Sequence, residues 1–399
     1  MLKPHAEPPS PTLKASSSAL FALGFRPFFS LAGLSATVLI LIWLGIWSGG
    51  LGVSSYYGPI PWHSHEMLFG YAVAIIAGFL LTAVRNWTGV NTPNGKPLML
   101  LALLWLAGRL LPALSDMIPG MVIAIVDLAF LPALALAIKP ALWQGQMKIN
   151  RIFVPLLLVM AVANLLTHLQ FLGVSNTYSR GTDAMMYLII LLIVFIGGRV
   201  MPFFTEAVIP DAKVKRNQTV EMTSAGALVA LVLVQMIYPS PWLTGPLAAL
   251  VAITQIIRVI GWHDRRVWGI PILWVLYTGM LWIIIGFILK ALAAAGYVGT
   301  NLATHALTLG GIGVLTLGMM CRVSLGHTGR PMQLLRMIEI SFILLNIAAA
   351  IRVLAPILLP GQYQLWVHLS GGIWALCFII FCYVYLPMLM KPRVDGKPG

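Results

Sequence analysis

The chain has 399 residues, of which 59% are hydrophobic and only 9% are charged, and its mean hydropathy is +0.92. This composition cannot supply a water-facing surface, so a soluble globular protein is excluded and most of the chain must face lipid. The formal net charge is +14, but the basic residues form no cluster in a segment long enough to fold by itself, which argues against nucleic acid as a partner.

Apolar stretches of transmembrane length recur along the chain, and short segments rich in turn-forming residues separate them. A bilayer core about 30 Å thick is crossed by about 20 helical residues. Strands of a membrane barrel would alternate polar and apolar positions, which these stretches do not. The sequence therefore predicts an all-α polytopic membrane protein. Its twelve transmembrane helices are expected at 30–48, 65–84, 98–114, 120–138, 152–173, 184–204, 220–238, 243–261, 269–290, 301–321, 337–357 and 363–388.

The two ends of the chain are predicted to be cytoplasmic tails. Residues 1–18 are rich in Pro, Ser and Ala, and we expect them to be disordered, with no cleavable signal peptide. Residues 19–390 are expected to form one membrane domain, because the predicted loops are too short to fold independently. Residues 391–399 form the second tail.

The distribution of lysine and arginine predicts the orientation of the helices. If the N-terminus is cytoplasmic, nineteen of these residues lie in cytoplasmic segments, and only Arg180 lies in an outer loop. Such an asymmetry determines orientation during insertion. The prediction is therefore a multi-pass inner-membrane protein that crosses the lipid bilayer with both termini in the cytoplasm.

The predicted helix at 65–84 begins beside two histidines, His63 and His65. If both positions are helical, their side chains project about 200° apart. The two imidazoles would then serve two different centres, or one centre and a neighbouring partner.

Two other predicted helices each contain an arginine at a depth in the membrane similar to that of His63 and His65. Arg109 and Arg352 are each about five residues from the predicted outer end of a helix. Arginine offers a bidentate partner for a carboxylate, so if the histidines at this depth bind haem, both arginines are predicted to bind its two propionates. The alternative for Arg109 is an ion pair with Asp127 across the short hairpin between the helices at 98–114 and 120–138.

Histidines gather at one depth. Five of the eight histidines, His63, His65, His168, His305 and His368, fall near predicted outer helix ends, at depths that differ by about 10 Å. Imidazole binds iron, copper and zinc, and a layer of histidines without accompanying cysteines or carboxylates favours haem or copper. For any single residue the alternative is an interfacial histidine that hydrogen-bonds water. For the group, we expect at least two to be ligands.

The second, sixth and tenth predicted helices have related ends. Each has an arginine at its inner end, and the second and tenth also begin near a histidine, His65 or His305. The arginines are Arg85, Arg199 and Arg322. This spacing suggests three four-helix units around a pseudo-threefold centre. The alternative is that the orientation rule alone places arginine at every inner helix end.

Several longer motifs resemble the NnrS family of bacterial membrane proteins. They are FRPFF at 25–29, WHSHEMLFGY at 62–71, GGRVMPFFT at 197–205, and HALTLGG at 305–311. The resemblance implies a twelve-helix protein that contains haem and copper and takes part in the response to nitric oxide and in tolerance of nitrosative stress. It also implies a distant similarity to the catalytic subunit of haem-copper oxidases.

The sequence departs from the haem-copper oxidases in two ways. No His-His pair occurs, although those enzymes use one at their copper site, and Asp127 is the only acid well inside a predicted helix. Coupled proton pumping is therefore not expected. Nitric oxide chemistry demands less, because a haem iron with an open position binds the neutral diatomic directly.

The sequence thus predicts a haem b protein, with copper as a further metal, that binds or turns over nitric oxide or its iron complexes. His65 and His305 are the first choice as haem ligands, and His63, His168 and His368 are the remaining metal candidates. No catalytic residue is assigned, and turnover would require an electron donor that the sequence does not identify. The alternatives are a secondary transporter and a non-catalytic nitric oxide sensor.

Overall fold

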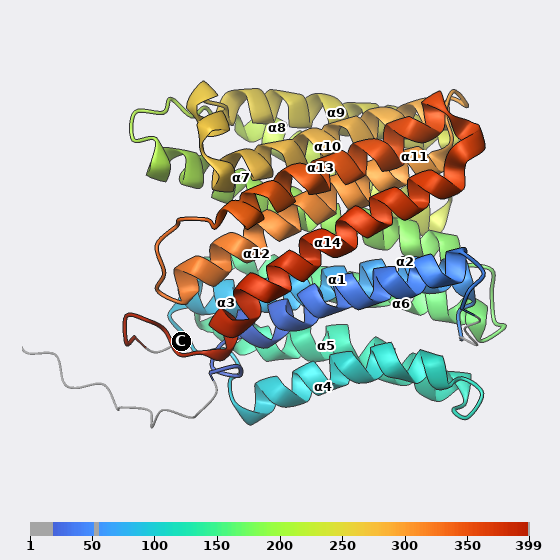
Figure 1. The fold of residues 1–399 in the computed structure, drawn as a ribbon, viewed down its shortest axis with the longest axis horizontal. Coiled ribbons are helices and arrows are strands. Elements are labelled where there is room, and N and C mark those ends of the chain that lie inside the picture. Colours follow the sequence, from blue (N-terminus) through green and yellow to red (C-terminus); the bar gives the residue numbers. More distant parts are fainter. Residues whose placement is uncertain (1–18, 52–55, 398–399) are drawn as a thin grey trace, which may run out of the picture.

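The computed structural model describes residues 19–51 and 56–397, and every regular element in these ranges is a helix. Twelve helices in the described ranges are long and apolar enough to cross a membrane, which confirms the predicted all-α polytopic fold (Figure 1). The predicted tail at 1–18 lies outside the described residues. In the second tail, the Val394 amide donates to the Thr328 carbonyl at 3.1 Å, so part of this segment packs on the bundle.

The helices follow one another with short connections. The first half of the chain contains α1 (Phe25–Trp47), α2 (Pro59–His65), η1 (Glu66–Ala72), α3 (Val73–Thr88), α4 (Lys96–Leu110), η2 (Leu111–Leu114), α5 (Gly120–Gln144), η3 (Lys148–Ile152), α6 (Phe153–Phe171) and α7 (Tyr178–Val208). The second half contains α8 (Gln218–Ile237), α9 (Pro241–Trp262), η4 (Arg265–Gly269), α10 (Pro271–Ala294), α11 (Thr300–His305), η5 (Ala306–Gly313), α12 (Val314–His327), α13 (Arg336–Leu358), η6 (Pro360–Gln362) and α14 (Tyr363–Met390). Of the η segments, η1 and η5 are π-helical and the others are 3₁₀.

Local sequence explains most helix ends. Proline lies in the first turn of α2, α4, α9 and α10, where its missing N–H costs nothing and its fixed φ suits a helix. Gly89 ends α3 with a φ of +71°, a left-handed conformation that glycine adopts without strain. Asn217 caps α8, because its side chain accepts hydrogen bonds from the amides of Thr219 and Val220.

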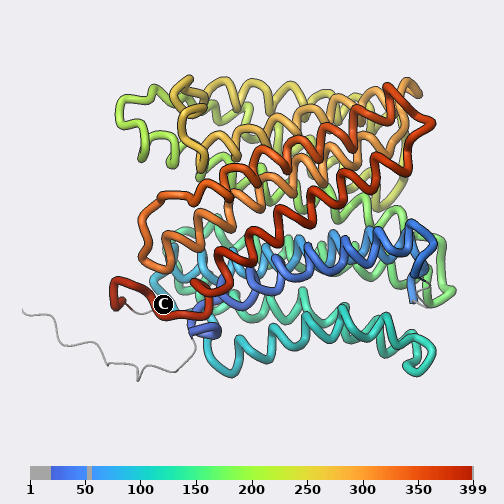
Figure 2. Tube along the Cα trace, viewed as in Figure 1, coloured from blue at the N-terminus to red at the C-terminus, as the bar shows by residue number. Residues whose placement is uncertain are grey.

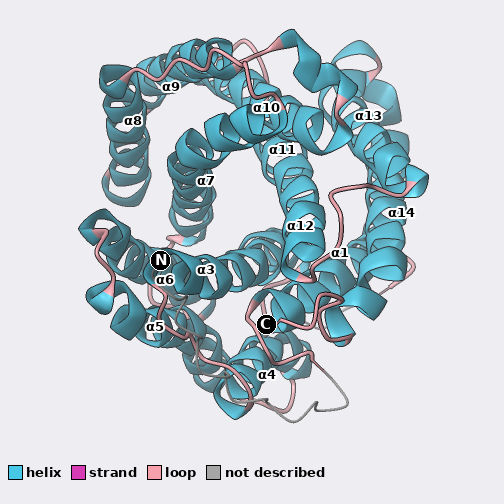
Figure 3. Cartoon of the chain, turned by 90° about the vertical axis from the view of Figure 1, so that its left-hand side faces the viewer, coloured by secondary structure: helices cyan, strands magenta, loops and turns pink. Residues whose placement is uncertain are grey.

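Four spans form the centre of the molecule. These are the second span (Pro59–Thr88), α7, α10 and the tenth span (Thr300–His327). In an apolar 18-residue stretch of each, 89%, 61%, 67% and 78% of the residues, respectively, are buried inside the protein. Figure 3 shows α3, α7, α10 and α11–α12 around the middle of the bundle, with the remaining helices outside them. The last helix, α14, packs along α1, so the first and last described helices lie side by side (Figure 2). Lipid is therefore in contact mainly with the outer helices.

Two of the central spans contain a π-helix directly after a histidine. In the second span η1 follows His65, and in the tenth span η5 follows His305. π-Helical turns are rare in proteins, and those that occur often lie at functional sites. The sixth span, α7, is α-helical over all of its 31 residues. The likeness between spans two and ten thus extends to backbone geometry, whereas the arrangement in three four-helix units stays a prediction.

Candidate metal centre and adjoining cavity

His63 and His65 lie on α2 and face different surroundings. His65 is fully buried, at 0% exposure, and its neighbours come from α5 and α6. The ring of His63 instead stacks on Trp43 of α1, with centroids 4.4 Å apart and an interplanar angle of 10°. The divergence predicted for these two helical positions therefore leads to two separate groups of residues.

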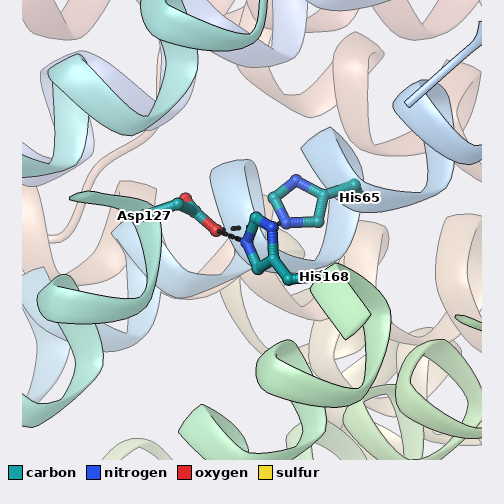
Figure 4. A group of neighbouring side chains, drawn as sticks. All are labelled: His65, Asp127 and His168. Carbon is teal, nitrogen blue, oxygen red and sulfur yellow. Dashed lines mark hydrogen bonds and ion pairs between the residues drawn. The ribbon is translucent and has the colours of Figure 1, made fainter. Parts of the chain in front are cut away.

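The first group joins two histidines and an aspartate from three helices. His65 of α2, Asp127 of α5 and His168 of α6 each offer a ligand atom, and these atoms lie within 4.8 Å of one another. Asp127 Oδ2 is 3.2 Å from His65 Nε2 and 3.0 Å from His168 Nε2. In Figure 4 both imidazoles point toward the Asp127 carboxylate.

Polar neighbours hold these three side chains in place. Asn164 Nδ2 donates to Asp127 Oδ2 at 2.7 Å, and Asn164 Oδ1 lies 3.1 Å from His65 Nε2. The Tyr57 hydroxyl lies 3.1 Å from the same nitrogen. Tyr57 precedes the second span, and burial, with a smaller effect of the Asp127 charge, raises its pKa well above the ordinary value. Tyr57 therefore keeps its proton.

The group also contains a buried arginine between two carboxylates. Arg109 pairs with Asp127 Oδ1, and its Nη1 lies 3.4 Å from Glu66 Oε2. Glu66 Oε1 is 3.4 Å from His65 Nδ1. When all three charged groups are ionised, one negative charge remains in a buried site, and such a charge is costly unless a cation compensates it. A bound metal ion or a protonated imidazole would supply that charge.

The donor set suits a metal ion. Ligands about 2.0–2.2 Å from a metal lie about 3.0–3.5 Å from one another, and the two Nε2–Oδ2 distances of 3.2 and 3.0 Å fall in this range. Two imidazoles and one carboxylate are a set that binds iron, zinc or copper. His65, Asp127 and His168 could therefore hold a metal ion.

The second group lines a cavity of about 380 Å³, within the range of about 300–1,000 Å³ found for small-molecule and cofactor sites. His63, His305 and Arg352 lie in its wall, among aromatic side chains that include Trp43 and Trp374. His63 belongs to the second span, His305 belongs to the tenth span, and Arg352 belongs to α13. Residues far apart in the sequence therefore meet around one space.

Buried nitrogen atoms in this wall have no protein partner. Among the described residues, neither His63 Nδ1 nor Arg352 Nη1 has a hydrogen-bond partner, whereas Arg352 Nη2 donates to the Tyr363 hydroxyl at 2.8 Å. His305 Nδ1 donates to the Asn301 carbonyl at 2.7 Å. A buried polar atom without a partner is costly, which points to a ligand that provides one. An imidazole, a cation and flat aromatic walls together fit a haem.

The predicted site residues divide between these two places. His65 and His168 lie in the metal centre, and His63, His305 and Arg352 lie around the cavity. His65 and His305, the first choice as haem ligands, are therefore not together. The remaining two residues differ as well. Arg109 pairs with Asp127, the alternative that the sequence left open, and His368 contacts Ser48 and the Gln364 carbonyl outside the described cavity lining.

The sequence reasoning missed the acidic part of the metal centre. It treated the histidines as lacking carboxylates and Asp127 as the only acid well inside a helix. Both statements are wrong, because Asp127 lies between two histidines and Glu66 is fully buried in η1. Asn164, on α6, was not considered. Polar side chains in apolar helices are rare and costly, and this signal would have indicated Glu66 and Asn164.

Comparison with known families identifies this chain over nearly its whole length. A family model described as NnrS protein matches residues 19–393, nearly the whole chain. Comparison with curated proteins finds none that matches.

Proposed function

The chain belongs to the NnrS family, and from this premise we propose that it is a haem-binding protein of the nitric oxide response in the bacterial inner membrane. The observation that carries the proposal is the cavity of about 380 Å³ between His63, His305 and Arg352. Its wall contains buried nitrogens without protein partners, as expected for a site shaped for a ligand.

His305 is the residue best prepared to hold a haem iron if haem binds in this cavity. A carbonyl can only accept, so the hydrogen bond from Nδ1 to Asn301 leaves Nε2 without a proton and able to bind iron. His63 is the second candidate ligand on the same cavity. Arg352 is the candidate partner of a propionate, because its Nη1 has no other described partner. The bound haem iron would supply a position for a neutral diatomic ligand.

The second part of the proposal is a metal ion at His65, Asp127 and His168. Copper and iron both suit this donor set. Asn164 and the buried Arg109 hold the Asp127 carboxylate, so the ligands are arranged before the metal binds. By the distribution of positive charge, both sites lie toward the periplasm. Reduction of nitric oxide would require an electron donor as a further partner, whereas binding would not.

An absorption spectrum of the purified protein tests the haem proposal. We expect a Soret band that shifts when nitric oxide is added, and loss of most of this band in His305→Ala. The matched control is His263→Ala. His263 directly follows the last residue of α9, contacts Trp268 of η4 and lines neither site. Colourless wild-type protein that takes up a solute in vesicles would instead support a transporter. Full haem content in both His305→Ala and His63→Ala would overturn the assignment of ligands.

A further inference from the structure

A second cavity, of about 90 Å³, lies at the centre of the bundle. Its wall includes Ile76 of α3, Ile189 of α7, Met280 of α10 and Met319 of α12. Among its described lining residues, Thr316 alone has a polar side-chain atom. The four most buried spans thus line an apolar space that the metal centre and the proposed haem site do not use.

This cavity suits a small apolar molecule better than water. A single water needs about 15 Å³ of such space and two to four polar partners, so the volume of 90 Å³ suffices but the partners are lacking. The Thr316 hydroxyl is already engaged, because it donates to the Ile312 carbonyl at 2.7 Å and accepts from the Tyr71 hydroxyl at 2.7 Å. Apolar cavities of this kind stay dry and bind xenon.

A single hydrogen bond lies in the wall between the two cavities. Tyr71 lines the larger cavity, Thr316 lines the apolar one, and their hydroxyls are the two that bond. Tyr71 belongs to η1, and the acceptor of the Thr316 proton, Ile312, belongs to η5. The two π-helical segments therefore position the side chains that separate the spaces. Trp374 packs on the Tyr71 ring, with centroids 5.5 Å apart.

We propose that the apolar cavity binds a neutral diatomic gas. From there the gas passes between Tyr71 and Thr316 into the larger cavity, which is lined by His63 and His305. The destination rests on the proposed function, since it assumes that haem occupies the larger cavity. Occupancy of the apolar cavity by a gas depends only on its volume and lining.

Gly197 offers a way to fill the cavity without disturbing its wall. It lies in the lining, and a Cβ atom there would meet no atom within 4 Å. Gly197→Leu should therefore extend into the empty space, and Gly197→Val is a smaller version if the leucine variant does not fold. Gly226→Leu is the matched control, because Gly226 is an exposed glycine on the neighbouring helix α8 where a Cβ atom also meets nothing within 4 Å.

Crystals pressurised with xenon test occupancy whether or not haem is present. We expect an anomalous peak between Ile76, Ile189 and Met280 in the wild type and in Gly226→Leu, and no peak in Gly197→Leu. A wild-type crystal without xenon at this place, or a peak that persists in the filled variant, would overturn the inference. Absence of haem from the purified protein would refute the proposed function, but the xenon experiment would still show whether the apolar cavity is occupied.

Flash photolysis of the nitric oxide complex tests the route. We expect Gly197→Leu to slow severalfold the rebinding of nitric oxide that enters from solution, because the leucine fills the cavity on its route. The equilibrium affinity for nitric oxide should stay the same, because the haem site itself is unchanged. Gly226→Leu should recombine at the wild-type rate. Equal rates in all three proteins would refute the passage between Tyr71 and Thr316, even where xenon occupies the cavity.

Discussion

Asp127 is the side chain that joins the metal centre to the buried charges around it. One of its oxygens lies within hydrogen-bonding distance of Asn164, His65 and His168, and the other pairs with Arg109. Loss of its charge removes a metal ligand and leaves the Arg109 guanidinium with Glu66 alone, at 3.4 Å. The two consequences can be measured separately.

We expect Asp127→Asn to lose the metal ion and to lower the free energy of unfolding by about 3–5 kcal/mol, the usual cost of breaking a buried ion pair. Adding Arg109→Gln should restore no metal, and it should cost less stability in Asp127→Asn than in the wild type, because only the Glu66 carboxylate then loses its cation, whereas in the wild type both carboxylates do. Denaturant unfolding in micelles and elemental analysis are the measurements. Glu339→Gln is the control, since it breaks a surface pair with Arg336 worth at most about 1 kcal/mol. Additive effects of the two substitutions would contradict the coupling.

Histidines could be selected from the sequence as candidate ligands, and their ligand role stays a prediction, but the sequence could not show which of them lie together. The rarity of ionisable side chains in apolar helices was enough to indicate His63, His65, His168 and His305. Which of them meet depends on the rotation of each helix about its axis, and a π-helical turn changes that rotation within a span. The separation of His65 from His305 was therefore outside the reach of the sequence.

The π-helical segment η5 packs closely against α10. Gly310, in η5, faces the Trp282 ring, and a Cβ atom there would lie 2.5–2.8 Å from three atoms of that side chain. Trp282 is held in turn by its hydrogen bond to Asn346, at 3.0 Å. A side chain at Gly310 would therefore have to displace η5 from α10.

We predict that Gly310→Ala lowers the free energy of unfolding by about 1–3 kcal/mol, as overpacking does in other cores. Gly372→Ala should leave it unchanged or slightly higher, since Gly372 is an exposed position in α14 where an added Cβ meets no atom within 4 Å. Denaturant unfolding of both variants in micelles provides the comparison. Equal stability of the two variants would show that η5 can move away from Trp282 at no cost.

The helices themselves were predicted well, whereas their irregularities were not. All twelve predicted spans are confirmed, and the largest differences lie at their ends, such as 65–84 predicted against Pro59–Thr88 observed. Hydropathy and length determine a span, but no local signal in the sequence distinguishes a π-turn from an α-turn. In the second span, the proline in the first turn of α2 suits a helix start that lies before the apolar stretch.

At the scale of the whole molecule, the distribution of positive charge predicts which side each site faces. Arg180 is the only lysine or arginine assigned to an outer loop, whereas nineteen are assigned to the loops, tails and helix ends on the opposite side. With this orientation, the proposed metal centre and the cavity between His63 and His305 lie on the periplasmic side. Gas, which crosses lipid freely, would reach them from either side.

Reporter fusions test this orientation. We expect alkaline phosphatase fused after Ser175, in the loop before α7, to be active, and a fluorescent protein fused after Gly399 to be bright. The exchanged fusions should be inactive and dark, because each reporter matures on one side of the membrane only. Activity of phosphatase at the C-terminus would place that end in the periplasm and move both sites to the cytoplasmic side.

The central claim is that the histidines hold two different centres, and paired analysis of haem and non-haem metal in three proteins tests it most directly. The wild type should contain both. His168→Ala should lose the metal ion and keep the haem, because His168 lies with Asp127 and outside the described cavity lining, whereas His305→Ala should lose the haem and keep the metal ion. Loss of both groups in each variant, or of neither, would contradict the division into two sites.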